Sequence, residues 1–125
     1  MKQLSKLFVG CLAVALVIFS SCSSNAPAAK GTVKAKGPFP EEKLGWHLGS
    51  QAYTFRLFSF AEALDKIAAA NLRYVEAFPG QTVGGGSSEK MTYELSPEGR
   101  QLVKKLLKDR GITVHAYGVV GAKDE

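Results

Sequence analysis

Residues 59–80, with the sequence SFAEALDKIAAANLRYVEAFPG, carry a helix signal followed directly by a strand signal. Ser59 is placed to cap a helix, and Glu62 three residues later completes a capping box. Asn71 is typical of the left-handed residue that ends a helix. The segment Tyr74-Val75-Glu76-Ala77-Phe78 is short and β-prone, and Pro79-Gly80 ends it. The stripe of apolar residues at helical spacing, which predicts one face docked on a sheet, comprises Phe60, Leu64, Ile67, Ala68 and Leu72.

The same alternation continues on both sides of this stretch. Residues 46–55, WHLGSQAYTF, predict a first strand, with Gln51, Tyr53 and Phe55 on one face. Ser96 and Pro97 start a second helix that Gly111 ends, and residues 112–120 predict a third strand. Strands that alternate with helices favour a parallel sheet with right-handed crossovers. About 75 residues of this pattern are typical of the opening third of a (β/α)8 TIM barrel, a fold of roughly 250 residues. On the pattern alone, a doubly wound sheet is the alternative.

Residues 81–95 form a long polar stretch around Gly84-Gly85-Gly86-Ser87-Ser88. This run lacks the Lys-Ser/Thr ending of a P-loop and the spacing of a dinucleotide-binding fingerprint. We therefore expect a mobile loop over the carboxyl edge of the sheet.

The N-terminus predicts export. Lys2 and Lys6 precede an uncharged run over residues 7–19 and then small residues, which is typical of a signal peptide over residues 1–21. The run is short of the about 20 residues that a membrane span requires. Phe19-Ser20-Ser21-Cys22 resembles the lipobox of bacterial lipoproteins, which implies lipidation of Cys22 and a membrane anchor. The alternative is an ordinary signal peptide cleaved nearby, which leaves Cys22 as a free thiol.

Residues 22–43 are rich in Ser, Ala, Lys, Gly and Pro and predict a flexible tether before a folded part over residues 44–125. The net charge of +5 includes Lys2 and Lys6, which would leave with the signal, and Lys30, Lys34 and Lys36 lie in the tether. We expect those lysines to be solvated. No basic stripe interleaved with aromatics is present in the sequence, so no nucleic-acid partner is predicted.

Three segments together resemble the N-terminal third of the sugar phosphate isomerase/epimerase family, the xylose isomerase-like TIM barrels. They are residues 49–56 (GSQAYTFR), 74–81 (YVEAFPGQ) and 115–120 (HAYGVV), and the resemblance covers residues 48–125. It implies that the chain is a fragment, because family members continue for five more strands. It also implies a divalent metal (Mn, Mg, Zn or Co) held by two Glu, an Asp and a His of those later strands, so no catalytic residue or metal ligand is assigned in this chain. The implied reaction is a proton transfer next to the carbonyl of a sugar or keto-sugar.

Four residues are candidate substrate-binding groups. Glu76 ends the second strand, and an unpaired buried carboxylate is costly, so it is expected either to contact a sugar hydroxyl or to form a salt bridge with Arg56 or Arg73. His115 lies in the third strand, on the predicted face of Tyr117, and is either a site residue or a hydrogen-bonded structural histidine. Gln51 and Tyr53 can hydrogen-bond and stack on a sugar, whereas the alternative for Tyr53 is barrel core. His47, before the first strand, is expected to face solvent.

The expected protein is thus an exported lipoprotein on the periplasmic side of the outer membrane, part of a sugar isomerase/epimerase-like enzyme and inactive alone. Ser23 after the lipidated cysteine implies, by resemblance to bacterial sorting, that the inner membrane is not favoured. The alternative function is a non-catalytic carbohydrate-binding lipoprotein. Residues 40–125 expressed alone are expected to be insoluble or molten, because three strands and two helices leave sheet surface bare.

Overall fold

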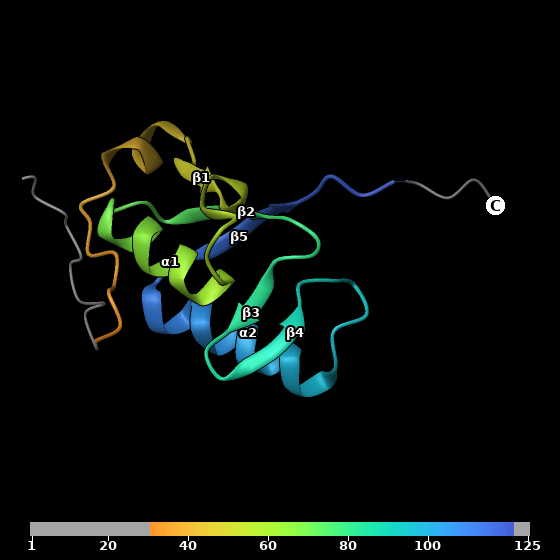
Figure 1. Cartoon of the computed structure of the whole chain (residues 1–125). Coiled ribbons are helices and arrows are strands. Elements are labelled where there is room, and N and C mark those ends of the chain that lie inside the picture. The colour runs from red at the N-terminus through yellow and green to blue at the C-terminus, as the bar shows by residue number, and fades with distance from the viewer. Residues whose placement is uncertain (1–30, 122–125) are drawn as a thin grey trace, which may run out of the picture.

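The computed structural model of the protein describes residues 31–121 and has a three-stranded parallel sheet at its centre (Figure 1). The strands are β1 (Gly49–Gln51), β2 (Tyr74–Ala77) and β5 (Thr113–Tyr117), in the order β1-β2-β5. The predicted α/β class and parallel pairing are confirmed. The predicted signal peptide and Cys22 lie outside the described residues.

Both predicted helices form, and their ends are those that the sequence indicates. Helix α1 (Phe60–Ala69) has both halves of the capping box between Ser59 and Glu62. Asn71 follows it at φ 56°, and the Leu72 N–H donates to the Ile67 carbonyl, which completes a Schellman ending. Helix α2 (Pro97–Arg110) is capped by the Ser96 hydroxyl and ends at Gly111, which is left-handed.

The hydrophobic core lies between the two helices and one face of the sheet. Along β2, Val75 and Ala77 are buried while Tyr74 and Glu76 are only half-buried, so a single face is covered. Helix α1 supplies its predicted stripe to this core, with Phe60, Leu64 and Ile67 fully buried. We call this the covered face. We call the opposite side the open face, which carries Gly49, Gln51, Tyr74, Glu76 and His115.

The first strand is shorter than predicted. The chain leaves the extended conformation after Gln51 and forms a 3-10 turn, η2 (Ala52–Phe55), closed by a hydrogen bond from the Arg56 N–H to the Tyr53 carbonyl. Ala52 is fully buried in this turn. Because a helical turn breaks the two-residue alternation of a strand, Tyr53 is exposed while Phe55 packs against the core, and the prediction that they share a face is wrong.

The expected mobile loop is instead an antiparallel hairpin, β3 (Thr82–Gly84) and β4 (Ser87–Lys90). Gly85 and Gly86 connect the strands with φ of 62° and 98°, the positive values that a tight two-residue hairpin turn requires. The hairpin packs on α1: Val83 is fully buried, and a Cβ on Gly84 would lie 2.6 Å from the Ser59 Oγ.

Part of the predicted tether is also bound to the domain. The Ala35 N–H donates to the Arg110 carbonyl at 3.1 Å, and the Lys36 and Gly37 N–H groups donate to the Asn71 Oδ1 at 3.0 and 3.2 Å. The segment continues into a 3-10 turn, η1 (Pro40–Leu44). Within the described residues, the ordered part therefore begins before Leu44, because backbone hydrogen bonds and the burial of Ala35 fix this segment.

Over residues 31–121 the sheet is open, with β1 and β5 at its two edges, so these strands show no barrel closure. No helix in this part of the chain is long and apolar enough to cross a membrane.

Candidate functional site

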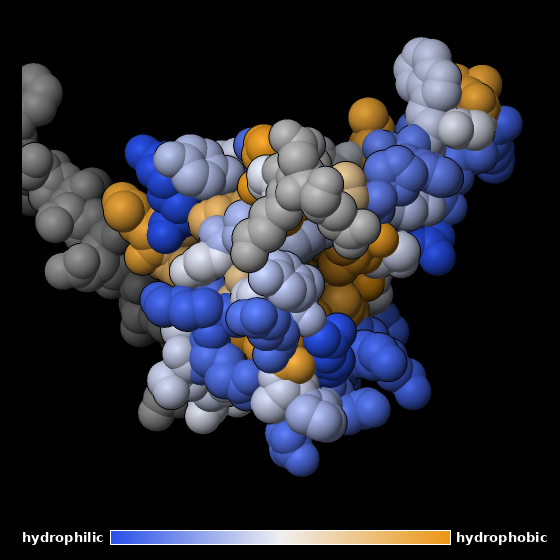
Figure 2. All heavy atoms as spheres, turned by 90° about the vertical axis from the view of Figure 1, so that its right-hand side faces the viewer, coloured by the Kyte–Doolittle hydropathy of each residue, from blue (hydrophilic) through white to orange (hydrophobic). Residues whose placement is uncertain are grey.

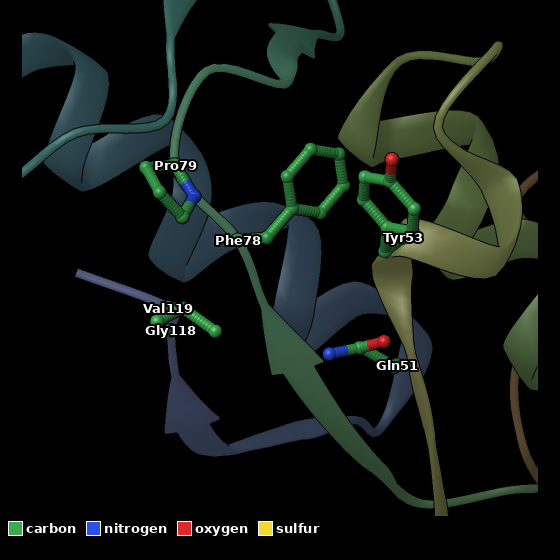
Figure 3. Close-up of a pocket in the computed structure, with 6 residues that line it drawn as sticks. All are labelled: Gln51, Tyr53, Phe78, Pro79, Gly118 and Val119. Atoms are coloured by element: carbon green, nitrogen blue, oxygen red, sulfur yellow. The ribbon is translucent and has the colours of Figure 1, made fainter.

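A hollow of about 370 Å³ lies at the carboxyl ends of the three parallel strands (Figure 3). Parallel strands bring their carboxyl ends to one edge, which is where α/β proteins of this kind bind ligands. The lining residues come from the end of each strand in turn: Gln51 and Tyr53, then Phe78 and Pro79, then Gly118 and Val119.

Gln51 and Glu76 are the polar pair beside this hollow. The two residues are register partners in β1 and β2, and the Gln51 Nε2 donates to the Glu76 Oε1 at 3.1 Å. A Cβ on Gly118 would lie 4.0 Å from the same carboxylate oxygen, so Gly118 borders the carboxylate without covering it. This amide contact is how the structure accommodates an acidic residue in an otherwise apolar strand.

The predicted salt bridges of Glu76 do not form. Arg73 pairs instead with Glu42 at 3.0 Å, and the Arg56 guanidinium lies 5.1 Å from the centre of the Tyr53 ring. Among the described residues Glu76 is in no ion pair, so its carboxylate is held by a neutral amide and keeps acceptor capacity for a ligand.

Two aromatic rings form an apolar wall of the hollow. Tyr53 and Phe78 meet edge to face with ring centres 5.1 Å apart, and Figure 3 shows both rings on the side of the hollow next to Gln51. Tyr53 remains 52% exposed. An exposed aromatic beside an amide and a carboxylate is able to stack on an apolar sugar face while the polar groups bind hydroxyls.

His115 does not line the 370 Å³ hollow but a neighbouring one, which Gln51 and Glu76 also line. The pairing of β2 with β5 shifts between Val75–Val114 and Glu76–Ala116, so His115 is the extra residue of a bulge. Its ring contacts Tyr74 and His47, with ring centres 5.8 and 5.0 Å away, in a second hollow of about 210 Å³.

The bulge also separates His115 from Tyr117. Tyr117 packs towards the core, and its hydroxyl reaches the Met91 carbonyl at 3.5 Å. The prediction that His115 and Tyr117 share a face is therefore wrong, because one extra residue reverses the alternation of side chains.

The Tyr74 hydroxyl is hydrogen-bonded to Glu42, which also pairs with Arg73 at the start of β2. Loss of hydration, followed by its hydrogen bond to the Glu42 carboxylate at 3.0 Å, raises the pKa of Tyr74. The Tyr74 hydroxyl is thus held as a donor, and its ring is stacked on His47 at 4.4 Å between ring centres. His47 is solvent-exposed, as predicted, but it also takes part in this aromatic cluster.

The structure therefore places Gln51 beside Tyr53 in the first hollow, and beside Glu76 and His115 in the neighbouring one. Sequence reasoning missed Phe78, Pro79, Gly118 and Val119 as lining residues. Each lies within or just after the carboxyl end of a predicted strand and follows β2 or β5 in the structure, so its position near a strand end was the available signal. In residues 31–121 there is no group of three or more His, Cys, Asp or Glu side chains placed to hold a metal ion, so the metal site implied by the resemblance has no donor set in this part of the chain.

Comparison with solved structures gives a partial match. The chain is similar to an uncharacterized protein from Parabacteroides distasonis, with 32% identity and a TM-score of 0.60 over 63% of this chain. The match spans 34% of that protein, so the matched part of this chain corresponds to about a third of its length. No protein-family model and no curated protein matches the sequence.

Proposed function

We propose that this domain is the N-terminal part of a (β/α)8 barrel of the sugar isomerase/epimerase type, and that its carboxyl-edge hollow contacts a sugar or keto-sugar. The observation that carries the proposal is the Gln51–Glu76 pair next to the Tyr53–Phe78 wall at the ends of neighbouring parallel strands. An amide and a carboxylate are suited to adjacent sugar hydroxyls, and exposed aromatic rings suit the C–H face of a sugar.

Two features support a longer barrel. The open face bears half-buried Tyr74 and Glu76, and β5 exposes Val114 at an edge with no further strand among the described residues. A parallel sheet normally has both faces covered. The similar protein from Parabacteroides distasonis is also about three times as long as the matched stretch.

In the complete protein, a divalent metal (Mn, Mg, Zn or Co) would be held by residues outside the part described here and would supply the polarisation for proton transfer next to a carbonyl. The residues of this chain would bind and orient the sugar. Export and a lipid anchor at Cys22, on the periplasmic side of the outer membrane, belong to the same proposal.

The test is sugar binding and turnover by the longer barrel protein of which this chain is proposed to be the N-terminal part. A panel of aldoses and ketoses is titrated with and without divalent metal, and interconversion is followed by NMR. Glu76→Gln should weaken binding of the preferred sugar about tenfold or more, because it removes a charged hydrogen-bond acceptor. Glu94→Gln, which removes an exposed carboxylate outside the hollow, is the matched control and should bind normally. Equal affinities of the two variants would remove Glu76 from the site.

A non-catalytic carbohydrate-binding lipoprotein is the second candidate. The Glu76 carboxylate already accepts from the Gln51 amide, an arrangement suited to recognition without proton transfer. Sugar binding with no interconversion under any metal condition would favour this candidate, whereas interconversion would exclude it.

A further inference from the structure

The edge of the sheet opposite the hollow has an exposed surface that the proposed sugar site does not use. It combines cationic and apolar side chains, and we call it the amino-edge surface. All of its members are exposed: Lys34, Lys36, Lys43 and Lys108, with Leu44, Trp46 and Leu48.

Several elements place these residues on the same edge. The helices run back against the strands, so both helices end where the strands begin (Figure 1). The N-terminal segment crosses there, bound through Ala35 to Arg110 at the end of α2 and through Lys36 to Asn71 after α1. Turn η1 stays at this edge because Glu42 pairs with Arg73, which immediately precedes β2.

The acidic groups around this surface are largely neutralised by other residues. Glu42 pairs with Arg73, Asp65 with Arg110, and Asp109 with Lys105. Of residues 31–121, none of the four lysines of the amino-edge surface is in an ion pair, and Glu41 is the remaining carboxylate close by. The surface is therefore positive.

The apolar members have the character of interfacial side chains. Leu44 is 68% exposed and Trp46, the sole tryptophan of the chain, is 63% exposed. Tryptophan prefers the boundary between lipid head groups and acyl chains, and lysine side chains bind anionic head groups while their stems cover apolar surface.

We propose that the amino-edge surface rests on an anionic phospholipid surface, so that the carboxyl-edge hollow opens away from the membrane. The orientation agrees with the proposed anchor, on which it partly rests. Eight residues lie between Cys22 and Gly31, so the two can be at most about 30 Å apart, and Gly31 leads directly into the segment that crosses this edge. Figure 2 looks onto the opposite side of the molecule, where hydrophilic and hydrophobic residues are interspersed.

The native tryptophan provides the test. The full chain, isolated from membranes of an expressing bacterium, is reconstituted into vesicles of phosphatidylcholine alone or mixed with phosphatidylglycerol, each with a head-group-labelled quencher lipid. We expect Trp46 fluorescence to be quenched in the anionic vesicles, and quenching to fall at least about threefold in 1 M salt, where charges are screened beyond about 3 Å.

A triple variant separates lysine contact from simple tethering. Lys34→Gln, Lys36→Gln and Lys108→Gln together should lower the quenching at least about threefold, because each lysine contributes to attraction by anionic lipid. The matched control removes three cations elsewhere, at Arg56, Lys66 and Lys90, and should be quenched like the parent chain.

The outcomes distinguish this inference from the proposed anchor. Three results would each overturn the contact of the amino-edge surface with lipid. They are equal Trp46 quenching in the two triple variants, quenching that does not change with salt concentration, and no quenching in anionic vesicles. Mass spectrometry of the same sample reports separately whether Cys22 is acylated. Acylation of Cys22 without Trp46 quenching would support the anchor and reject the proposed orientation. Trp46 quenching without acylation would support the orientation and reject the anchor.

Discussion

The two faces of the small sheet differ in how fully the described residues complete them. On the covered face, Val75 and Ala77 are in the hydrophobic core with side chains of α1. All of these residues are at most 1% exposed: Val75, Ala77, Phe60, Leu64 and Ile67. On the open face, Gln51, Glu76 and His115 are polar and at least partly accessible. The comparison teaches that one strand buries alternate residues in the core and leaves the others available for the proposed sugar contact, so that substitutions at adjacent positions should have different consequences.

The largest effect is expected from shortening the chain to residues 40–125. This removes Val33, Ala35 and Phe39, which pack in or against the core, and leaves Asn71 without its backbone partners. The prediction that this fragment is insoluble or molten thus gains a second reason beside the open face. Amide dispersion and near-UV circular dichroism should be weaker than in a chain begun at Gly31, which shares the open face but keeps the N-terminal segment, and a sharp thermal transition of the shorter chain would contradict the prediction.

Leu64→Ala should break the covered face. Leu64 is fully buried, so the substitution leaves a cavity and should lower the free energy of unfolding by about 2–5 kcal/mol. Leu57→Ala is the control, since Leu57 is 88% exposed and should change it by less than about 0.5 kcal/mol. Pulse proteolysis in urea measures both, and similar midpoints would show that this face is not closely packed.

Asp65→Ala tests the contact that joins the two helices. The Arg110 guanidinium, in a residue 6% exposed, donates from Nε and Nη2 to the Asp65 carboxylate at 2.8 and 3.0 Å. Removing the carboxylate leaves a buried cation without its partner and should cost about 1–3 kcal/mol. Asp109→Ala, which breaks the exposed Lys105 pair, should cost less than about 0.5 kcal/mol by the same measurement. Equal losses would count against a special role for burial.

The capping box predicts a pH dependence. Hydrogen bonds from the Ser59 side chain and then its backbone lower the pKa of Glu62 below its ordinary value of 4.5. A lowered carboxylate pKa means stabilisation that is present above that ordinary value and is lost as the pH falls through the folded-state pKa. Ser59→Ala should therefore cost about 1 kcal/mol at neutral pH and less below pH 4.5. A cost that does not change between these conditions would separate Ser59 from the Glu62 carboxylate.

The smallest effect should come from the open face. Glu76→Gln should change the free energy of unfolding by less than about 0.5 kcal/mol, because Glu76 has no ion pair in the described part and an amide fits the same place. Urea midpoints beside those of Leu64→Ala give the comparison directly. A loss above about 1 kcal/mol would mean that Glu76 is a structural rather than a recognition residue.

The sequence predicted the elements whose ends have local chemical signals. Ser59, Glu62 and Asn71 gave α1, and Ser96, Pro97 and Gly111 gave α2, because caps are decided by a few neighbouring residues. It failed where tertiary packing decides. The polar β4 strand has no hydrophobic alternation, although the Gly85-Gly86 pair was a turn signal that could have predicted the hairpin.

The candidate site was predictable only in part. Gln51 and Glu76 are close because strands pair in register, which the order of strand and helix signals already implied. No spacing in the sequence predicts the bulge at His115 or the 3-10 turn after Gln51, because both interrupt an otherwise regular strand pattern.

Asn71 performs two tasks that ordinarily belong to different residues. Its backbone reverses the chain after α1, while its side-chain oxygen accepts from the Lys36 and Gly37 N–H groups. Glycine would satisfy the reversal but remove both hydrogen bonds to the N-terminal segment, whereas a residue that favours negative φ would disturb the reversal itself. Substitution at this position is thus limited by two separate requirements, because one residue both returns the chain towards β2 and binds residues 36 and 37.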